Sequence, residues 1–358
     1  MQAYAQELAA LTAELAAIPS PSGHERKKAE FIRNWFVREC GVTPAIDEVD
    51  NVVLKINGPE PGLIAYLAHT DTVFGQVDKI EPVERDGRLY APSIGDDSCN
   101  AAALMLVTRR YLQENKTGGK SRLIVFNVGE EGLGNLRGVR HIMACWPVTE
   151  LVAIDGTLDE LITAGVGSLR YRITVSTEGG HSWTRFGNKN AIYYAARLIK
   201  KLQEMSVPLS PKTTYNVGTV NGGTSVNTIA QHCEMLLDLR SEDAACLEAV
   251  RDQTFACIES ERIDGVTIET ECLGDRPVGP NQEQSALVQH ILAIRAEMGL
   301  SATTVAASTD CNIPLSMGVP SACFGVYLGK GAHTMEEYLE LDSLPTGLNL
   351  LWRIFTEL

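Results

Sequence analysis

The 358-residue chain is predicted to be an α/β protein whose first domain is interrupted by a smaller, inserted α+β domain. Largely apolar runs such as 63–68 and 151–154 alternate with amphipathic stretches, as expected for strands that are buried on both faces. From about residue 168 the pattern changes, because 169–175 alternates strictly between apolar and polar residues, which indicates a sheet with one face in water. The length also exceeds what one hydrophobic core usually organises, so two domains are expected.

Helices and strands are predicted to alternate along the N-terminal part of the chain. Two prolines and a glycine in 18–23 end the first helix, and Ser22 or Gly23 begins the second. Asp86-Gly87 is a favourable tight-turn pair, so a hairpin is predicted around it. The other predicted elements of this part are helices at 3–17, 24–39 and 100–113, and strands at 63–68, 123–128 and 151–154.

The inserted domain is predicted to follow the order β-α-β-β-α-β, which is that of a ferredoxin-like unit. We place it at 167–277, so that 1–166 and 278–358 together form the first domain. The predicted elements are strands at 169–175, 214–220, 233–240 and 266–271 and helices at 189–205 and 243–262, after which the first domain resumes with helix 284–297, strand 322–326 and helix 342–356.

Composition and charge exclude several classes of protein. The formal net charge of −14 argues against nucleic acid or an anionic membrane as a partner, because neither attracts an acidic protein. Residues 1–7 lack a basic segment followed by an apolar core, and no run is long enough for a transmembrane helix, so a cytoplasmic protein is expected. The nine cysteines are scattered and never spaced Cys-x-x-Cys, which fits reduced thiols better than disulfides or a zinc-thiolate site.

Five short acidic or histidine-bearing segments point to a metal centre. Several follow the carboxyl end of a predicted strand, where ligands bind in open α/β sheets, so their side chains are expected to converge on a cleft. Imidazole and carboxylate groups are the usual nitrogen and oxygen ligands of zinc, and one carboxylate can span two ions. The five segments are His69-Thr70-Asp71, Gly95-Asp96-Asp97, Glu130-Glu131, Asp155-Gly156 and Ala332-His333-Thr334.

Longer motifs occur in a fixed order along nearly the whole chain: His69-Thr70-Asp71-Thr72-Val73, Gly95-Asp96-Asp97, Gly129-Glu130-Glu131-Gly132, Ile154-Asp155-Gly156, Gly179-Gly180-His181-Ser182, Asp238-Leu239-Arg240 and His333-Thr334-Met335-Glu336-Glu337. Together they resemble the co-catalytic zinc metallopeptidase family that includes peptidase T-like tripeptidases, carboxypeptidase G, aminoacylases and succinyl-diaminopimelate desuccinylase. The resemblance implies a mixed-sheet catalytic domain and an inserted ferredoxin-like domain that acts as a lid and dimerisation domain.

The resemblance also implies a cofactor and its ligands. Two zinc ions per chain are expected, although imidazole and carboxylate ligands accept cobalt or manganese as well. Asp71, two residues beyond His69 on an extended segment, is expected to hold that histidine in its orientation and tautomer. The resemblance assigns the ligands as His69 and Asp155 for one zinc, Glu131 and His333 for the other, and Asp96 between the two ions.

Catalysis is assigned to Glu130, since its neighbour Glu131 is already a ligand. By resemblance, Glu130 takes a proton from a water held between the ions as this water attacks an amide carbonyl, and returns it to the leaving amine. His181 resembles the family histidine that enters the cleft of a neighbouring subunit and stabilises the oxyanion, which implies a homodimer. Asn227 and Arg240 are candidates for binding a substrate carboxylate, because a guanidinium can donate two parallel hydrogen bonds.

The predicted function is hydrolysis of small peptides by an exopeptidase. After Asp96 the chain continues Asp97-Ser98-Cys99-Asn100, without the lysine and glycine of many family members, but peptidase T-like relatives share the Asp-Asp pair. Cys99 is interpreted as a small packing residue. Two alternatives stay open, namely a deacylase of N-acyl amino acids with the same centre and a metal-binding scaffold without catalysis. A serine hydrolase is disfavoured, because the chain contains no Gly-x-Ser-x-Gly segment.

Overall fold

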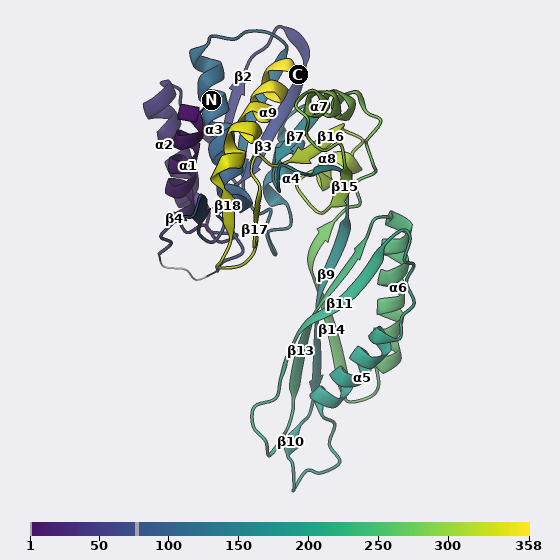
Figure 1. The fold of residues 1–358 in the computed structure, drawn as a ribbon. Helices are drawn as coiled ribbons and strands as arrows, with labels where there is room; N and C mark the ends of the chain where they lie inside the picture. The colour runs from purple at the N-terminus through teal and green to yellow at the C-terminus, as the bar shows by residue number, and fades with distance from the viewer. Residues whose placement is uncertain (1, 76–78) are drawn as a thin grey trace. The chain divides into compact units, whose positions relative to one another are not determined.

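The computed structural model describes residues 2–75 and 79–358 of the chain. These residues form two compact units (Figure 1). Unit 1 comprises Met1–Gly165 and Gly279–Leu358, and unit 2 comprises Val166–Val278. None of the helices in the described part of the chain is long and apolar enough to cross a lipid bilayer.

The main sheet of unit 1 is mixed. Its strands follow the order β1-β2-β6-β3-β7-β16-β8-β15, in which β3 runs parallel to both β6 and β7, while β2 runs antiparallel to β6. The mixed α/β fold predicted from the sequence is therefore confirmed. The strands are β1 (Ala45–Ile46), β2 (Val52–Ile56), β3 (Glu60–His69), β6 (Lys120–Asn127), β7 (Glu150–Ile154), β8 (Leu161–Gly165), β15 (Thr304–Ala307) and β16 (Ser321–Phe324).

Helices cover both faces of this sheet, which explains the nearly continuous apolar character of its central strands. Along β3, Ile64 and Tyr66 belong to one buried cluster, together with residues of α1, α2, α3, α7 and α9. Ala65 and Leu67 belong to a second cluster with residues of α4 and α8. The helices are α1 (Gln2–Ala16), α2 (Arg26–Cys40), α3 (Asn100–Gln113), α4 (Arg137–Cys145), α7 (Ala286–Glu297), α8 (Asn312–Ser316) and α9 (Leu344–Glu357).

A small antiparallel sheet of unit 1 has the order β17-β18-β5-β4. The turn between β4 and β5 places Asp86 at φ 54° and Gly87 at φ 73°, as a tight two-residue hairpin requires. The connection between β17 and β18 carries His333, so this sheet brings the C-terminal motif towards the main sheet. The bounds are β4 (Val83–Arg85), β5 (Arg88–Tyr90), β17 (Gly329–Lys330) and β18 (Tyr338–Glu340), with short helical turns at η1 (Ile94–Cys99) and η2 (Leu341–Ser343).

Unit 2 is built on an antiparallel sheet with the strand order β11-β13-β9-β14. Helices α5 and α6 pack on one face of it through a separate apolar cluster (Figure 1). The order along the chain is β-α-β-β-α-β, with a small additional pair β10-β12, which is the ferredoxin-like arrangement. The elements are β9 (Gly167–Thr177), β10 (Gly180–His181), α5 (Ala191–Gln203), β11 (Thr213–Gly222), β12 (Thr228–Ile229), β13 (His232–Ser241), α6 (Ala244–Glu261) and β14 (Val266–Arg276).

The structure departs from the sequence prediction at the start of α2. This helix begins at Arg26 rather than at Ser22 or Gly23. The Ser22 hydroxyl instead donates a hydrogen bond to Asp71 Oδ2 at 2.6 Å, so a contact distant in sequence takes the place of a helix cap. Several short elements, including α4, α8, β8 and β15, have no counterpart in the prediction, because such short segments depend on packing against the rest of the fold.

Candidate metal centre

Three neighbouring strands deliver candidate ligands to one edge of the main sheet. His69 is the last residue of β3, and Asp155 directly follows β7. The loop after β6 carries Glu130 and Glu131. Because β3 is parallel to both β6 and β7, the carboxyl ends of the three strands lie at the same edge.

Asp96 lies between two histidines. Its Oδ1 is 3.0 Å from His69 Nε2, and its Oδ2 is 3.2 Å from His333 Nε2. His333 Nε2 also lies 3.0 Å from Glu131 Oε1. Asp155 can offer an oxygen within 4.8 Å of ligand atoms of His69 and Asp97. The five residues predicted as ligands thus gather in unit 1, with the two oxygens of Asp96 turned to different histidines.

The charges of this cluster fit divalent cations. Hydrogen bonds to Asp96 and Glu131 raise the pKa of His333 to about 10, and burial raises the pKa of Asp155 to about 6. His333 and Asp155 therefore hold their protons more strongly than usual, because carboxylates lie close together in a largely buried place. Metal ions compensate the same negative charge, and imidazole and carboxylate groups are suitable ligands for them. The residues present thus fit a metal centre.

Asp71 connects the first ligand to the loop with the two glutamates. Its Oδ1 accepts a hydrogen bond from Glu130 N at 3.0 Å, and its Oδ2 accepts one from Glu131 N at 2.9 Å. His69 Nδ1 lies 3.1 Å from the backbone oxygen of Asp71, which fixes the ring with Nε2 towards Asp96. Burial opposes the charge of Asp71, but hydrogen bonds from His69 and Ser22 outweigh it and lower its pKa to about 2.

Two acidic residues that the sequence analysis left without a role organise the segment around Asp96. Asp97, joined to Asp96 by a cis peptide bond, accepts hydrogen bonds from His69 N and from Asn100 Nδ2, at 2.9 and 2.7 Å. Glu337 accepts hydrogen bonds from the backbone N–H groups of Ser93, Gly95 and Asp96 at 2.7 to 2.9 Å. Asp97 lies in the same sequence motif as the proposed ligand Asp96, and Glu337 lies in the same motif as His333.

Asp310 is a third residue without a signal in the sequence. It is buried, and its Oδ2 accepts a hydrogen bond of 2.6 Å from Asn127 Nδ2, at the last residue of β6. Burial and the nearby charge of Glu130 raise the pKa of Asp310 well above its ordinary value. No motif in the sequence marks this residue, because it contacts the end of β6 only in the folded chain.

The candidates in unit 2 have different surroundings. His181 is exposed, and its Nδ1 accepts a hydrogen bond from Trp183 N at 3.2 Å. Asn227 lies beside it, since Ser182 N donates to the backbone oxygen of Asn227 at 3.0 Å. Arg240 stands elsewhere on the sheet and donates from Nε to Asp238 Oδ2 at 2.7 Å. Unit 2 thus brings His181 and Asn227 together but leaves Arg240 apart from both.

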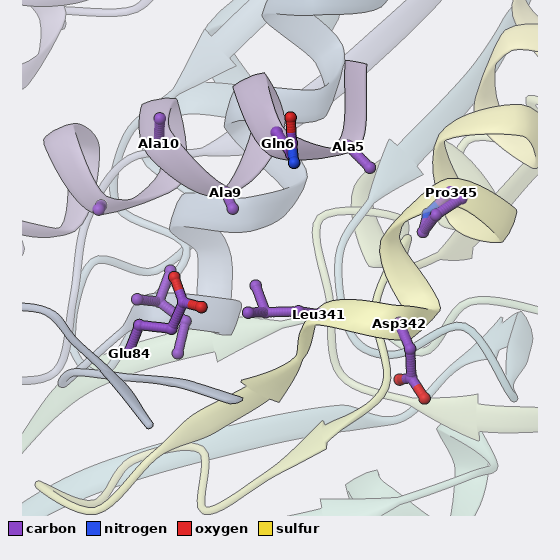
Figure 2. Close-up of a pocket in the computed structure, with 10 residues that line it drawn as sticks. Ala5, Gln6, Ala9, Ala10, Glu84, Leu341, Asp342 and Pro345 are labelled. Carbon is purple, nitrogen blue, oxygen red and sulfur yellow. The ribbon is translucent and has the colours of Figure 1, made fainter. Parts of the chain in front are cut away.

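A cavity of about 490 Å³ in unit 1 contains none of the predicted site residues (Figure 2). One wall is the alanine-rich face of α1, including Ala5 and Ala9, and another includes Leu341 and Pro345. Its lining includes two acids, Glu84 and Asp342, but no histidine and none of the candidate metal ligands. We therefore assign the chemistry to the strand ends rather than to this cavity.

The fold and the clustered side chains define a mixed α/β protein with a candidate metal centre. The chain belongs to the peptidase family M20/M25/M40, whose family model matches residues 65–357. This match confirms both the resemblance found in the motifs and the prediction that the chain is an enzyme.

Individual relatives carry different activities. A succinyl-diaminopimelate desuccinylase from Nitrosospira multiformis is 26% identical over 83% of this chain and 84% of that protein. A tripeptidase structure from Staphylococcus aureus has a TM-score of 0.81 at 22% identity and covers 99% of this chain and 98% of its own. The structure of Bacillus subtilis YxeP, described as a dinuclear metal binding peptidase, has a TM-score of 0.68 at 17% identity. The match covers 100% of this chain and 99% of that chain. Structural similarity at this level establishes the fold, while the family model establishes the family. The substrate stays open.

Proposed function

We propose that the protein is a di-zinc exopeptidase that hydrolyses amide bonds of small peptides. The observation that carries this proposal is the position of the two glutamates after β6. Glu131 lies against His333, while Glu130 can offer an oxygen within 4.8 Å of both His69 and Glu131. A proposed metal ligand and a second carboxylate therefore stand side by side, on a loop fixed by Asp71.

The proposed ligands are His69 and Asp155 for one ion, Glu131 and His333 for the other, and Asp96 for both. When bound, the ions supply Lewis acidity to the scissile carbonyl and lower the pKa of the attacking water. We assign zinc, and the same ligands accept cobalt or manganese.

Glu130 is proposed as the general base. It is 6% exposed, and the Asp71 side chain holds its backbone at 3.0 Å. Its carboxylate takes a proton from the water as the new C–O bond forms, and delivers it to the amide nitrogen as the C–N bond breaks. One residue thus serves both halves of the reaction without net proton transfer to solvent.

We further propose that unit 2, predicted as 167–277, is a lid and dimerisation domain that supplies His181 to a second chain. Arg240 pairs with Ser168 at one end of β9, while His181 follows the other end, beyond Ser176. The eight residue steps from Ser168 to Ser176 span about 26 Å. A small peptide cannot contact both Arg240 and His181 of the same chain across this distance. A peptide bound to Arg240 could therefore contact only the His181 of a partner chain.

The orientation of His181 suits oxyanion stabilisation. Because its Nδ1 accepts a backbone hydrogen bond, the neutral ring carries its hydrogen on Nε2 and can donate it outwards. Trp183 and Phe186 next to it are 85% and 91% exposed, as expected for a surface that a partner covers. Asn227 and Arg240 remain our candidates for binding a substrate carboxylate.

The second candidate function is removal of an acyl group from an N-acyl amino acid. The similarity to the Nitrosospira multiformis desuccinylase over 83% of the chain favours it. The metal ligands and Glu130 serve either reaction, because both break an amide bond, and selectivity depends on the shape of the substrate pocket.

Bound metal and substrate range test the proposal together. Metal content is measured on the freshly purified protein, and hydrolysis of dipeptides, tripeptides, N-acetyl and N-succinyl amino acids is followed before and after chelation. We expect at least two ions per chain and cleavage of peptides that chelation abolishes and zinc restores. Preferential cleavage of the N-acyl amino acids would favour the deacylase, and absence of metal after reconstitution would refute the proposal.

A further inference from the structure

A second cluster of metal-binding side chains lies elsewhere in unit 1 and shares no residue with the candidate centre. His141 and Cys145 stand four residues apart on α4, and therefore on the same face of the helix. Asp47 and Glu48, just after β1, meet His141 there. Neither the family motifs nor the proposed reaction uses these four residues.

The geometry centres on one ring nitrogen. His141 Nε2 lies 3.1 Å from Glu48 Oε2, 3.6 Å from Asp47 Oδ2 and 3.6 Å from Cys145 Sγ. Ligands of a tetrahedral zinc ion at bond lengths of roughly 2.0 to 2.3 Å stand about 3.3 to 3.6 Å apart. The separations of 3.1 to 3.6 Å from this nitrogen are close to those values. Ligand atoms of His141, Asp47 and Glu48 all lie within 4.8 Å of one another, and the exposed Cys145 thiol can complete the set by rotation about its side-chain bonds. Ion pairing with His141 explains the two carboxylates, and the Cys145 thiol contacts the same ring, 3.6 Å from Nε2 and 4.0 Å from Nδ1. As a thiolate, this side chain is also a usual ligand of zinc.

Part of the cluster is held rigidly before any ion binds. Asp47 Oδ1 accepts hydrogen bonds from Val49 N and Asn51 N, and its Oδ2 accepts one from Asn51 Nδ2 at 2.8 Å. The remaining lone pair, on Asp47 Oδ2, is still available to a cation. Glu48 and Cys145 are exposed, so each can adjust by rotation about its side-chain bonds.

We propose that His141, Cys145, Asp47 and Glu48 form a third metal site, which binds a borderline divalent cation such as zinc. The combination of thiolate, imidazole and carboxylates favours this class over magnesium or calcium, which prefer oxygen ligands alone. The ion clamps α4 to the turn at 47–51. This turn also contacts the end of β6, because Val128 N donates to Asn51 Oδ1 at 3.1 Å. The site thus stiffens the base of the loop that carries Glu130.

Cobalt titration of the metal-depleted full-length chain tests this site independently of catalysis. The proposed catalytic ligands include no cysteine, so a thiolate-to-cobalt charge-transfer band in the near ultraviolet reports the third site alone. We expect three equivalents to bind in the wild type, and the band to grow with one of them. Cys145→Ser should abolish the band, and His141→Ala should abolish one equivalent, while both variants keep the other two.

Cys272→Ser is the matched control, because Cys272 is also an exposed cysteine but lies in unit 2. This variant should keep the band and all three equivalents. A wild-type protein that shows no band at saturation, or a band that survives in Cys145→Ser, would overturn the proposal. If the wild type shows the band but binds only one equivalent of cobalt, the proposed catalytic centre is contradicted and the third site is supported.

Discussion

The candidate functional groups of unit 1 and unit 2 are held in opposite ways. In unit 1, Asp71, Asp97 and Glu337 are buried, and each accepts hydrogen bonds from the backbone of a neighbouring segment. In unit 2, His181 and Asn227 are exposed and are held mainly by their own loop. The candidate metal centre is therefore assembled within one unit, whereas the groups of unit 2 are exposed to solvent.

The difference follows from the cost of burying charge. A buried carboxylate is tolerated only when hydrogen bonds or opposite charges compensate it, so the acids of unit 1 depend on one another. An exposed histidine needs no such compensation. Substitutions at the centre should therefore change metal binding, whereas substitutions at His181 should change turnover and leave metal content intact.

The largest effect is expected from Glu130→Gln. This variant keeps the size of the side chain but removes the base, so kcat should fall about 10³-fold. Metal content should stay at the wild-type level, because the neighbouring Glu131 is the assigned ligand. Metal analysis and steady-state kinetics on one preparation check both statements. Turnover that stays near the wild-type rate would exclude Glu130 as the base.

His181→Ala should lower kcat about 10²-fold, the cost of losing one oxyanion donor, with metal content unchanged. Mixing this variant with Glu130→Gln sharpens the test. A mixed two-fold symmetric dimer has two sites. In one site, the His181→Ala chain supplies Glu130 and the Glu130→Gln chain supplies His181, so this site is intact. The other site lacks both residues. After free exchange of chains, about a quarter of the wild-type activity should return.

Light scattering provides the control for this mixing experiment, because exchange requires a dimer. If the dimers exchange and the mixture stays inactive, His181 does not act across the interface. If the protein is a monomer at working concentration, the partner contribution is excluded altogether.

The sequence predicted the parts of the fold and centre that follow from local patterns. Helix 100–113 agrees with α3, because its apolar periodicity and its burial in the core favour the same conformation. The strand ends at His69 and Asp155 were predictable, since apolar runs break off there. The family resemblance then supplied roles for these residues that spacing alone does not give.

Residues that act through distant contacts could not be predicted. Ser22 was expected to begin a helix but donates to Asp71, 49 positions further along the chain. Glu337 organises the segment around Asp96 from 241 positions away, and Asp310 contacts Asn127 across 183 positions. Such pairs form only after the strands are in register, so no local periodicity reveals them.

Asp71→Asn should lower metal affinity about 10- to 100-fold, as expected for a group that orients ligands without binding metal. An amide keeps one acceptor oxygen, but its NH₂ group faces one of the two N–H donors of the glutamate loop. Competition with a chelator measures the affinity. Asp252→Asn, at an exposed acid of unit 2, is the matched control and should change nothing. Equal effects of both substitutions would contradict a special role for Asp71.

The smallest effects should separate the stabilities of the two units. Asn190 caps α5 of unit 2 by accepting from Ile192 N at 2.9 Å, and Ser285 caps α7 of unit 1 by accepting from Val288 N at 3.3 Å. Replacing either by alanine should cost about 1 kcal/mol of unfolding free energy. The units have separate apolar cores, so we expect two transitions in denaturant unfolding. Asn190→Ala should lower the stability of unit 2, whose transition does not depend on metal. Ser285→Ala should lower the stability of unit 1, whose transition chelation also lowers. A single transition shifted alike by both substitutions and by chelation would instead show that the units unfold as one.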